Sequence, residues 1–332
     1  MRRRNHARQC VGLGLGALVA TWRSLATLSG AKIVMQSKDG VLRKLAALKE
    51  GGARKLQVVA DFDRTLTKAS VGGKEVDSSF KVLASCQRLP DSFKQEDLEK
   101  RRFYLAIEQN ATIPDHDKER ALREWHEWHS GKFQMHGLQW IDLVESVRGS
   151  NMELRSDFSE MQSIMQRAGI PLLVFSAGIA DVIEEFLRQS GFAVEDHLGK
   201  TIFVVSNRIV WNSKEIFHEF AEPYIMSVNK DGTHVESQLD GTSRVHSNEN
   251  VILLGDSMSD LNMIRGLDVK HVLTVGFLND EKHEESYKEA FDVVIIGAEA
   301  GLSYVRRVLN YVIGAEEIGF DPDLNCSMSL LL

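Results

Sequence analysis

The chain has 332 residues, of which 43% are hydrophobic and 26% are charged, and its formal net charge is −7. This composition is typical of a globular protein with one large or two modest domains. The three cysteines, Cys10, Cys86 and Cys326, lie far apart in the sequence. Their spacing excludes a disulfide-rich framework and a cysteine zinc motif, and it favours a reducing compartment.

The charge is unevenly distributed. Residues 1–38 contain seven of the 40 Lys and Arg residues and none of the 47 Asp and Glu residues, so the rest of the chain is strongly acidic. An acidic body argues against a nucleic-acid polymer as partner, since such a partner requires a basic face. An acidic enzyme that acts on anionic phosphates would instead need a local cation, supplied by a metal ion and a lysine.

The first 38 residues differ from the rest, and we expect them to form a basic extension outside the folded domains. An Arg cluster precedes an apolar run at residues 11–20 that is too short to span a bilayer. An Arg-rich, acid-free start resembles an import sequence for a mitochondrion or plastid. A secretory signal and a simple disordered extension are the alternatives.

Residues 41–50 predict an amphipathic helix, which Gly51 and Gly52 end. The apolar run at residues 56–60 then predicts a strand, which stops at Asp61-Phe62-Asp63-Arg64-Thr65. In an open α/β sheet, ligands bind beyond the carboxyl ends of the strands. Two close carboxylates repel each other unless a cation lies between them, and Mg²⁺ prefers oxygen ligands. The alternative is an Asp-rich turn without a ligand.

Residues 68–150 predict a mostly helical insertion, a cap domain that follows the first strand motif. Its helical segments lie near residues 94–108, 118–129 and 138–147. A helical cap that faces a site at the strand ends would exclude water and set specificity.

From residue 151 onward, apolar strands alternate with helices. This rhythm predicts a doubly wound, Rossmann-like, mostly parallel sheet, built from residues 39–67 and 151–320, with a loose tail at 321–332. The expected strands are 171–175, 201–205, 251–254, 271–275 and 293–296. The expected helices are 158–167, 179–189, 261–264 and 299–313.

Two further polar motifs follow apolar strands. Ser176 comes directly after one strand and, as the first residue of a helix, could hold a phosphate with its hydroxyl and the following amides, with Gly178 allowing close approach. The alternative for Ser176 is an ordinary helix cap. Asp256 and Asp260 follow another strand and could join Asp61 at a metal ion, or simply begin a helix.

Together, these motifs resemble the haloacid dehalogenase-like phosphohydrolases, and more closely the pyrimidine (cytosolic type III) 5′-nucleotidases. The resemblance covers about residues 40–320. It is carried by the segments 60–67, 175–181, 229–232 and 252–257.

The resemblance implies roles for the motif residues. Asp61 would be the nucleophile that forms an aspartyl-phosphate, and Asp63 the general acid and base. Asp61, the main-chain carbonyl of Asp63 and Asp256 would hold Mg²⁺, with Asp260 behind them. The residues expected to bind the phosphate are Ser176, Ala177 and Gly178.

The missing cation is expected to be Lys230, which lies in the family's Asn-Lys context, rather than Lys214. Arg64 departs from the family, which usually has Met or Glu at this position, and its role is open. In the cap, Glu108 matches the residue that contacts the nucleobase. His129 lies in a segment that lines the base pocket, but its identity departs from the family, so the preferred base is open.

We therefore expect a Mg²⁺-dependent 5′-nucleotidase that hydrolyses CMP or UMP, or 7-methylguanosine monophosphate. The alternatives are a phosphatase of phosphoserine or a sugar phosphate and, more distantly, a non-catalytic phosphate-binding protein. We expect a cytoplasmic monomer with no stable membrane span, and a mitochondrial or plastid location as the alternative. A zinc site at His126 and His129 is disfavoured because no third ligand of matching geometry is evident.

Overall fold

The computed structural model describes residues 31–110, 112–194, 201–239 and 248–315. Most of the expected basic extension and all of the expected tail at 321–332 lie outside the described residues. Within them, no helix combines the length and apolar character needed to cross a membrane.

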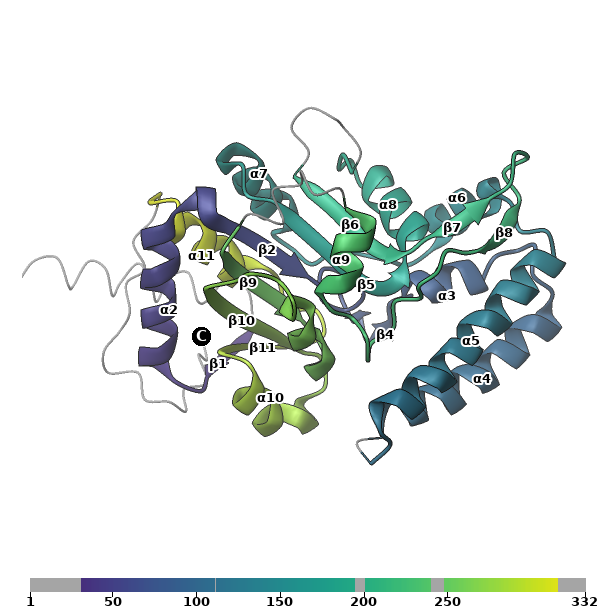
Figure 1. The fold of residues 1–332 in the computed structure, drawn as a ribbon, viewed down its shortest axis with the longest axis horizontal. Coiled ribbons are helices and arrows are strands. Elements are labelled where there is room, and N and C mark those ends of the chain that lie inside the picture. The colour runs from purple at the N-terminus through teal and green to yellow at the C-terminus, as the bar shows by residue number, and fades with distance from the viewer. Residues whose placement is uncertain (1–30, 111, 195–200, 240–247, 316–332) are drawn as a thin grey trace, which may run out of the picture.

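A seven-stranded sheet forms the centre of the molecule (Figure 1). Its strand order is β1-β11-β10-β9-β2-β5-β6, and all neighbouring pairs are parallel except β1 with β11. In chain order the strands are β1 (Lys32–Met35), β2 (Leu56–Ala60), β5 (Leu172–Ile179), β6 (Ile202–Asn207), β9 (Asn250–Gly255), β10 (His271–Leu278) and β11 (Val293–Ile296). The expected doubly wound, mostly parallel sheet is confirmed.

Strand β1 corrects one expectation. Residues 32–35 fall inside the segment assigned to a basic extension, yet they pair antiparallel with β11, with Lys32 opposite Ile296. The short apolar run Ile33-Val34-Met35 explains this, because Val34 is buried against the sheet's neighbours. Helix α2 (Lys38–Gly51) follows at once, and the Ser37 side chain caps it by accepting from the Gly40 amide.

Helices cover both faces of the sheet and bury two separate apolar clusters. One face carries α2, α7 (Phe158–Ala168), α8 (Ala180–Gln189) and α11 (Ser303–Val312). The other carries α9 (Gly232–Gln238) and α10 (Glu284–Ala290). Short 3₁₀ turns occur at η1 (Ala53–Lys55), η3 (Met258–Ile264) and η4 (Glu281–His283). The helix expected at 261–264 is thus part of a 3₁₀ turn.

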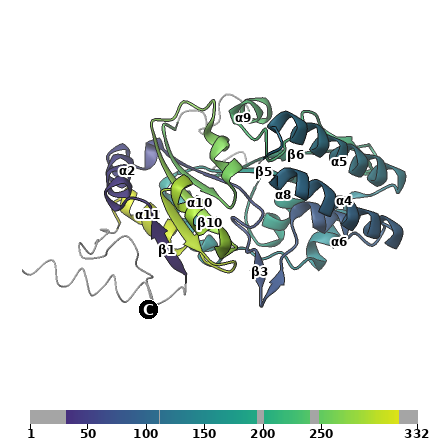
Figure 2. The same cartoon turned by 90° about the horizontal axis from the view of Figure 1, so that it is seen from below.

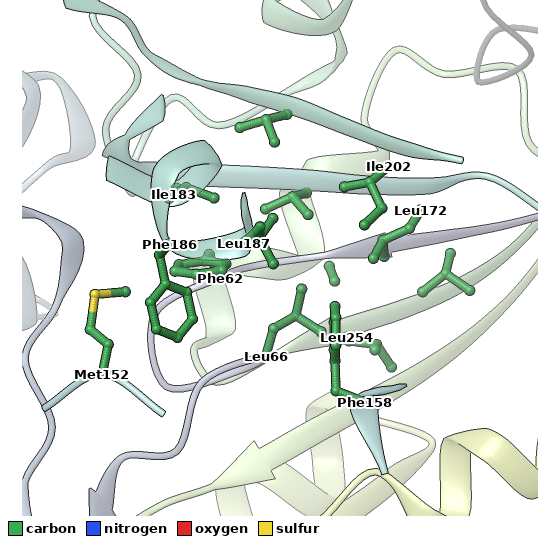
Figure 3. Packing of buried hydrophobic residues seen from close by; sticks show 14 of the residues in the cluster. Phe62, Leu66, Met152, Phe158, Leu172, Ile183, Phe186, Leu187, Ile202 and Leu254 are labelled. Atoms are coloured by element: carbon green, nitrogen blue, oxygen red, sulfur yellow. The ribbon is translucent and has the colours of Figure 1, made fainter. Parts of the chain in front are cut away.

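Phe62 anchors the loop that carries the first motif (Figure 3). Its side chain is fully buried and meets Phe186 of α8 edge to face, with ring centroids 6.0 Å apart. The apolar residue between Asp61 and Asp63 therefore fixes the loop to the core, while the two carboxylates are left for the site.

The cap contains α3 (Ser79–Ala84), α4 (Asp91–Gln109), α5 (Asp115–Met135) and α6 (Trp140–Gly149), with the small hairpin β3 (Ser70–Val71) and β4 (Lys74–Glu75). Helices α4 and α5 lie side by side at the end of the molecule opposite α2 (Figures 1 and 2).

A hairpin from later in the chain packs with the cap helices, although the sequence analysis placed its residues in the core. The hairpin β7 (Ile209–Trp211) and β8 (Phe217–Phe220) packs on α5, and Phe217 meets Phe133 edge to face at 5.6 Å. Aromatic side chains in the hairpin explain this, because their apolar area is buried against the aromatic face of α5.

His126 of α5 is buried among these aromatic rings. Its ring stacks on Tyr224 at 5.3 Å and meets Phe80 edge to face at 5.0 Å. Its Nδ1 has no hydrogen-bond partner among the described residues. Burial lowers the pKa of His126 to about 3, so the ring is neutral in the folded protein.

This buried histidine makes stability depend on pH. The folded pKa lies below the unfolded value, so the unfolded state binds the proton first and stability falls as the pH drops below about 6.5. We expect a loss of up to about 1.4 kcal/mol per pH unit from this group. Urea unfolding of His126→Phe at about pH 7 and about pH 5 should show a smaller fall than the wild type. The exposed His271→Gln is the control and should lose as much stability as the wild type over this pH range. An equal loss of unfolding free energy in His126→Phe and the wild type would contradict the prediction.

Candidate active site

The topology brings carboxylates from two strand ends together. Asp61 follows β2 and Asp256 follows β9, and these strands are parallel neighbours, with Ala60 opposite Leu254. Oxygen atoms of Asp61, Asp256 and Asp260 all lie within 4.8 Å of one another. Such a cluster at the carboxyl edge of a parallel sheet lies where ligands of open α/β folds bind.

Lys230 supplies the positive charge inside this cluster. Only 2% of the residue is exposed, and Nζ lies 2.7 Å from Asp61 Oδ1 and 2.7 Å from Asp260 Oδ1. Burial alone would lower the pKa of Lys230, but the charges of Asp260 and Asp61 outweigh it and raise the pKa above its usual value. The other candidate, Lys214, is exposed in the β7–β8 hairpin.

One lysine does not neutralise the cluster. Burial raises the pKa of Asp61 to about 7, against the opposing effect of Lys230. Burial, with the charges of Asp260 and Asp61, also raises the pKa of Asp256 well above its usual value. These shifts mark a site that is short of positive charge.

Asp260 has a different role from its neighbours. Its Oδ1 accepts from Lys230, and its Oδ2 accepts from the Asp256 amide at 3.0 Å and from the Ser257 amide and hydroxyl at 2.9 Å each. A Cβ on Gly255 would lie 2.5 Å from the Asp260 Cβ, so only glycine fits there. Asp260 therefore holds the loop and Lys230.

The remaining oxygens fit a hard divalent cation. Asp61 Oδ2 has no hydrogen bond within the described part of the chain. The carboxylate of Asp256 has only long contacts there, 3.5 Å from Thr65 Oγ1 and 3.4 Å from Asn279 Nδ2. Carboxylate oxygens with free lone pairs are ligands that Mg²⁺ takes. The donor set thus matches the ion expected from the sequence.

Asp63 is oriented by a residue that the sequence analysis missed. Ser79, the first residue of α3, donates its amide to Asp63 Oδ1 at 2.9 Å and its hydroxyl to Oδ2 at 2.8 Å. Burial raises the pKa of Asp63, and these two bonds lower it. The adjacent Ser78, which caps α3 by accepting from the Lys81 amide, marks the helix start in the sequence but does not reveal the contact with Asp63.

Ser176 does not begin a helix, contrary to expectation. Strand β5 continues through it to Ile179, with an irregular register after Phe175, and α8 begins at Ala180. The Ser176 hydroxyl accepts from the Gly178 amide at 3.1 Å. The segment that was expected to bind phosphate is therefore a distorted strand end rather than a helix terminus.

Two features hold this segment next to Asp63. A Cβ on Gly178 would lie 2.1 Å from Ser79 Oγ, so glycine is required for the approach. Asn207, also missed from the sequence, donates to the carbonyls of Ala177 and Gly178 at 2.9 and 3.1 Å. Its side chain also exchanges two hydrogen bonds with the backbone of Ile225, which ties the segment to the stretch that leads to Lys230.

The two predicted cap residues have different surroundings. Glu108, near the end of α4, accepts a hydrogen bond from the Ser227 hydroxyl, three residues before Lys230. His129 is buried, with Nδ1 3.0 Å from the Trp125 carbonyl oxygen and Nε2 2.8 Å from Asp97 Oδ1. Contrary to expectation, neither ring nitrogen of His129 is left for a substrate.

The Arg64 side chain pairs with the cap hairpin and not with Asp61 or Asp63, which precede it in the sequence. Its φ of 64° is in the left-handed region, and its Nη2 lies 2.5 Å from Glu75 Oε1 on β4. Glu75 also accepts from Arg101 of α4 at 3.4 Å. Arg64 therefore connects the first motif to the cap.

The chain matches the family described as Pyrimidine 5′-nucleotidase (UMPH-1) over residues 64–313. The chain belongs to this family. Its fold is accordingly that of the haloacid dehalogenase-like hydrolases, as expected, and it is a hydrolase of the 5′-nucleotidase class.

Relatives and a solved structure agree with this membership. The chain is 30% identical to the 7-methylguanosine phosphate-specific 5′-nucleotidase of Gallus gallus, over 86% of this chain and 98% of the relative. It is also 30% identical to the Homo sapiens protein of the same name, over 87% and 95%. The crystal structure of cytosolic 5′-nucleotidase IIIB bound to cytidine superposes with a TM-score of 0.74 at 28% identity, covering 88% of this chain and 97% of that one.

The contact between Ser79 and Asp63 predicts a loss of turnover in Ser79→Ala. Without the hydroxyl, Asp63 loses one of its two positioning bonds, and we expect kcat to fall about tenfold or more, since misplaced acid–base groups lose most of their contribution. Phosphate release measures this. Ser78→Ala is the matched control: it removes a helix cap worth about 1 kcal/mol but leaves Asp63 in place. Equal loss of kcat in both variants would contradict the prediction.

Proposed function

We propose that this 5′-nucleotidase hydrolyses nucleoside 5′-monophosphates through an aspartyl-phosphate on Asp61, with Mg²⁺ as cofactor. The observation that carries the proposal is the cluster of Asp61, Lys230, Asp256 and Asp260, of which only Asp256 is half-buried and the others are buried, with Asp63 oriented beside it by Ser79. A carboxylate is an established covalent acceptor of phosphoryl groups.

In the first step, Asp61 Oδ2 attacks phosphorus while Lys230 holds Oδ1. A bond from Asp61 to phosphorus forms, and the bond from phosphorus to the nucleoside 5′-oxygen breaks. Protonated Asp63 gives its proton to that leaving oxygen. In the second step, Asp63 takes a proton from water, which attacks phosphorus and releases phosphate and free Asp61.

The phosphoryl group needs positive charge and hydrogen-bond donors more than covalent help. Lys230 provides charge from the protein, and the Ser176 hydroxyl with the Ala177 and Gly178 amides would provide donors. The Gly178 amide, which donates to the Ser176 hydroxyl in the structure, would share its hydrogen with the phosphate. Asp61, the Asp63 carbonyl and Asp256 would hold Mg²⁺, with Asp260 behind them. When bound, the ion neutralises charge on the transferring phosphoryl group.

For the nucleoside we propose 7-methylguanosine and cytidine as the preferred groups. Two relatives are named for 7-methylguanosine phosphate, and one structure holds cytidine. Glu108 can accept from the exocyclic amine of either base. A methylated guanine also carries positive charge, which favours a nearby carboxylate such as Glu108.

Phosphate release from a substrate panel tests this reading. We expect Mg²⁺-dependent release from CMP, UMP or 7-methylguanosine monophosphate well above that from phosphoserine and sugar phosphates. A preference for the non-nucleotide esters would be consistent with the proposed phosphatase mechanism but would contradict the proposed specificity for nucleoside monophosphates. A non-catalytic phosphate-binding protein would release nothing from any of them, with or without a chelator.

A cytoplasmic location and a monomeric state belong to the same proposal. One relative is named a putative cytosolic 5′-nucleotidase. Size-exclusion chromatography with light scattering tests the monomer, and a fluorescent fusion of the whole chain tests the location. Import into mitochondria or plastids would show that residues 1–30 act as a targeting sequence.

Replacing the nucleophile separates covalent catalysis from simple binding. Asp61→Asn keeps the shape of the side chain but cannot form the phosphoenzyme, so we expect kcat to fall by at least about a thousandfold with the fold intact by circular dichroism. The exposed Asp39→Asn on α2 should retain full activity. Turnover near the wild-type rate in Asp61→Asn would exclude the covalent scheme.

Glu108→Ala tests base recognition. We expect kcat/KM for 7-methylguanosine monophosphate and CMP to fall about tenfold to a hundredfold, since a lost hydrogen bond to a charged group costs about 1.5–3 kcal/mol. Hydrolysis of p-nitrophenyl phosphate, which has no base, should hardly change. Glu99→Ala, on an exposed turn of the same helix, is the matched control. Equal losses on all esters would show that Glu108 does not contact the base.

A further inference from the structure

Arg155 is a buried arginine that the mechanism above does not use. It lies where the chain returns from the cap to the core, next to the bridge between Thr67 and Leu154, and its amide donates to the Leu66 carbonyl at 2.9 Å. Only 1% of the residue is exposed.

Its guanidinium binds the loop that carries the first motif. Nε donates to the Thr65 carbonyl at 2.8 Å, and Nη2 donates to the Arg64 carbonyl at 2.6 Å. Nη1 donates to the Ala300 carbonyl at 2.6 Å, which fixes the guanidinium to the loop after β11. Arg64, whose carbonyl accepts this bond, has a left-handed φ of 64°. The residue just before it, Asp63, carries the proposed carbonyl ligand.

A second route leads from Arg155 to Asp256. Nη2 of Arg155 also donates to Asn279 Oδ1 at 2.9 Å. Asn279 Nδ2 in turn lies 3.4 Å from Asp256 Oδ2 and 3.3 Å from the Arg64 carbonyl. Arg155 therefore contacts the first metal-ligand loop directly and reaches Asp256 in the second loop through Asn279.

The charge of Arg155 has no ion-pair partner within the described ranges. Its acceptors are carbonyls and one amide, and the guanidinium lies 4.3 Å from the centre of the Phe277 ring. A buried charge without a paired carboxylate is costly. The guanidinium offers its five donors to backbone carbonyls and to the Asn279 amide oxygen, a set of acceptors that a neutral side chain could not satisfy together.

We propose that Arg155 is a positioning residue for the metal site: it holds the Asp63–Thr65 loop and, through Asn279, Asp256 in the arrangement that binds the cation. This inference rests on the proposed Mg²⁺ site. Groups behind metal ligands commonly change metal affinity by about 10-fold to 100-fold when they are replaced.

The sign of the effect separates positioning from charge. Removing a cation near three carboxylates would, by electrostatics alone, strengthen the binding of Mg²⁺. Removing the hydrogen bonds to the Arg64 and Thr65 carbonyls and to Asn279 would weaken it. Arg155→Met should therefore bind Mg²⁺ more weakly than the wild type only if the loss of positioning outweighs the loss of the positive charge.

Isothermal titration of Mg²⁺ into the whole, nucleotide-free protein measures this directly. We expect the dissociation constant to rise about tenfold or more in Arg155→Met and by a smaller factor in Arg155→Lys, which keeps the charge and some donors. The matched control is Arg306→Met, since Arg306 pairs with Asp157 at 3.0 Å on the same segment but does not contact either metal-ligand loop.

Asn279→Ala tests the second route, from Arg155 to Asp256, and replaces Arg155→Met in the experiment if that variant fails to fold. We expect Asn279→Ala to bind Mg²⁺ more weakly than the wild type. Unchanged or tighter binding in the Arg155 and Asn279 variants, or an equal loss in Arg306→Met, overturns the inference while leaving the proposed function intact. If the wild type does not bind Mg²⁺, both the metal assignment and this inference are overturned. Phosphate release from nucleoside monophosphates without Mg²⁺ would in that case still show that the protein is a nucleotidase.

Discussion

Mutual repulsion among buried and half-buried carboxylates is the constraint on which this site depends. Asp61, Asp256 and Asp260 place their oxygens within 4.8 Å of one another, and Asp63 lies two residues from the first. The single ammonium of Lys230 binds two of them and leaves the rest uncompensated. The proposed divalent cation would supply the missing positive charge on binding and would also offset the charge of an anionic phosphate ester.

The sheet makes the arrangement inevitable once the strands are in register. Strands β2, β5 and β9 are neighbours and run the same way, so the residues that follow them meet at one edge. Phe62, buried between the two motif carboxylates, anchors the first loop. The cap then contributes from outside the sheet, with Ser79 orienting Asp63 and Glu108 reaching the stretch before Lys230.

Sequence patterns predicted those parts of the fold that have a local signal. Apolar strands that end at Asp61, Ser176 and Asp256 are visible in the sequence, and parallel α/β topology brings such ends together. Ser79, Asn207 and Arg155 could not be found this way, because each acts through contacts with segments distant in the chain. Strand β1 and the β7–β8 hairpin were misassigned because short apolar runs do not reveal which neighbours will cover them. His129 was expected at the substrate, but tertiary packing with Asp97 uses it within the cap.

The central claim is that Asp61 carries the phosphoryl group during turnover, and rapid-quench labelling tests it most directly. The enzyme is mixed with ³²P-labelled 7-methylguanosine monophosphate or CMP and Mg²⁺, quenched in acid within milliseconds, and digested. The account predicts acid-stable, hydroxylamine-sensitive label on the peptide that contains Asp61, formed before steady-state phosphate release. Active enzyme that turns over these substrates without labelled protein, or with label on a different residue, would contradict it.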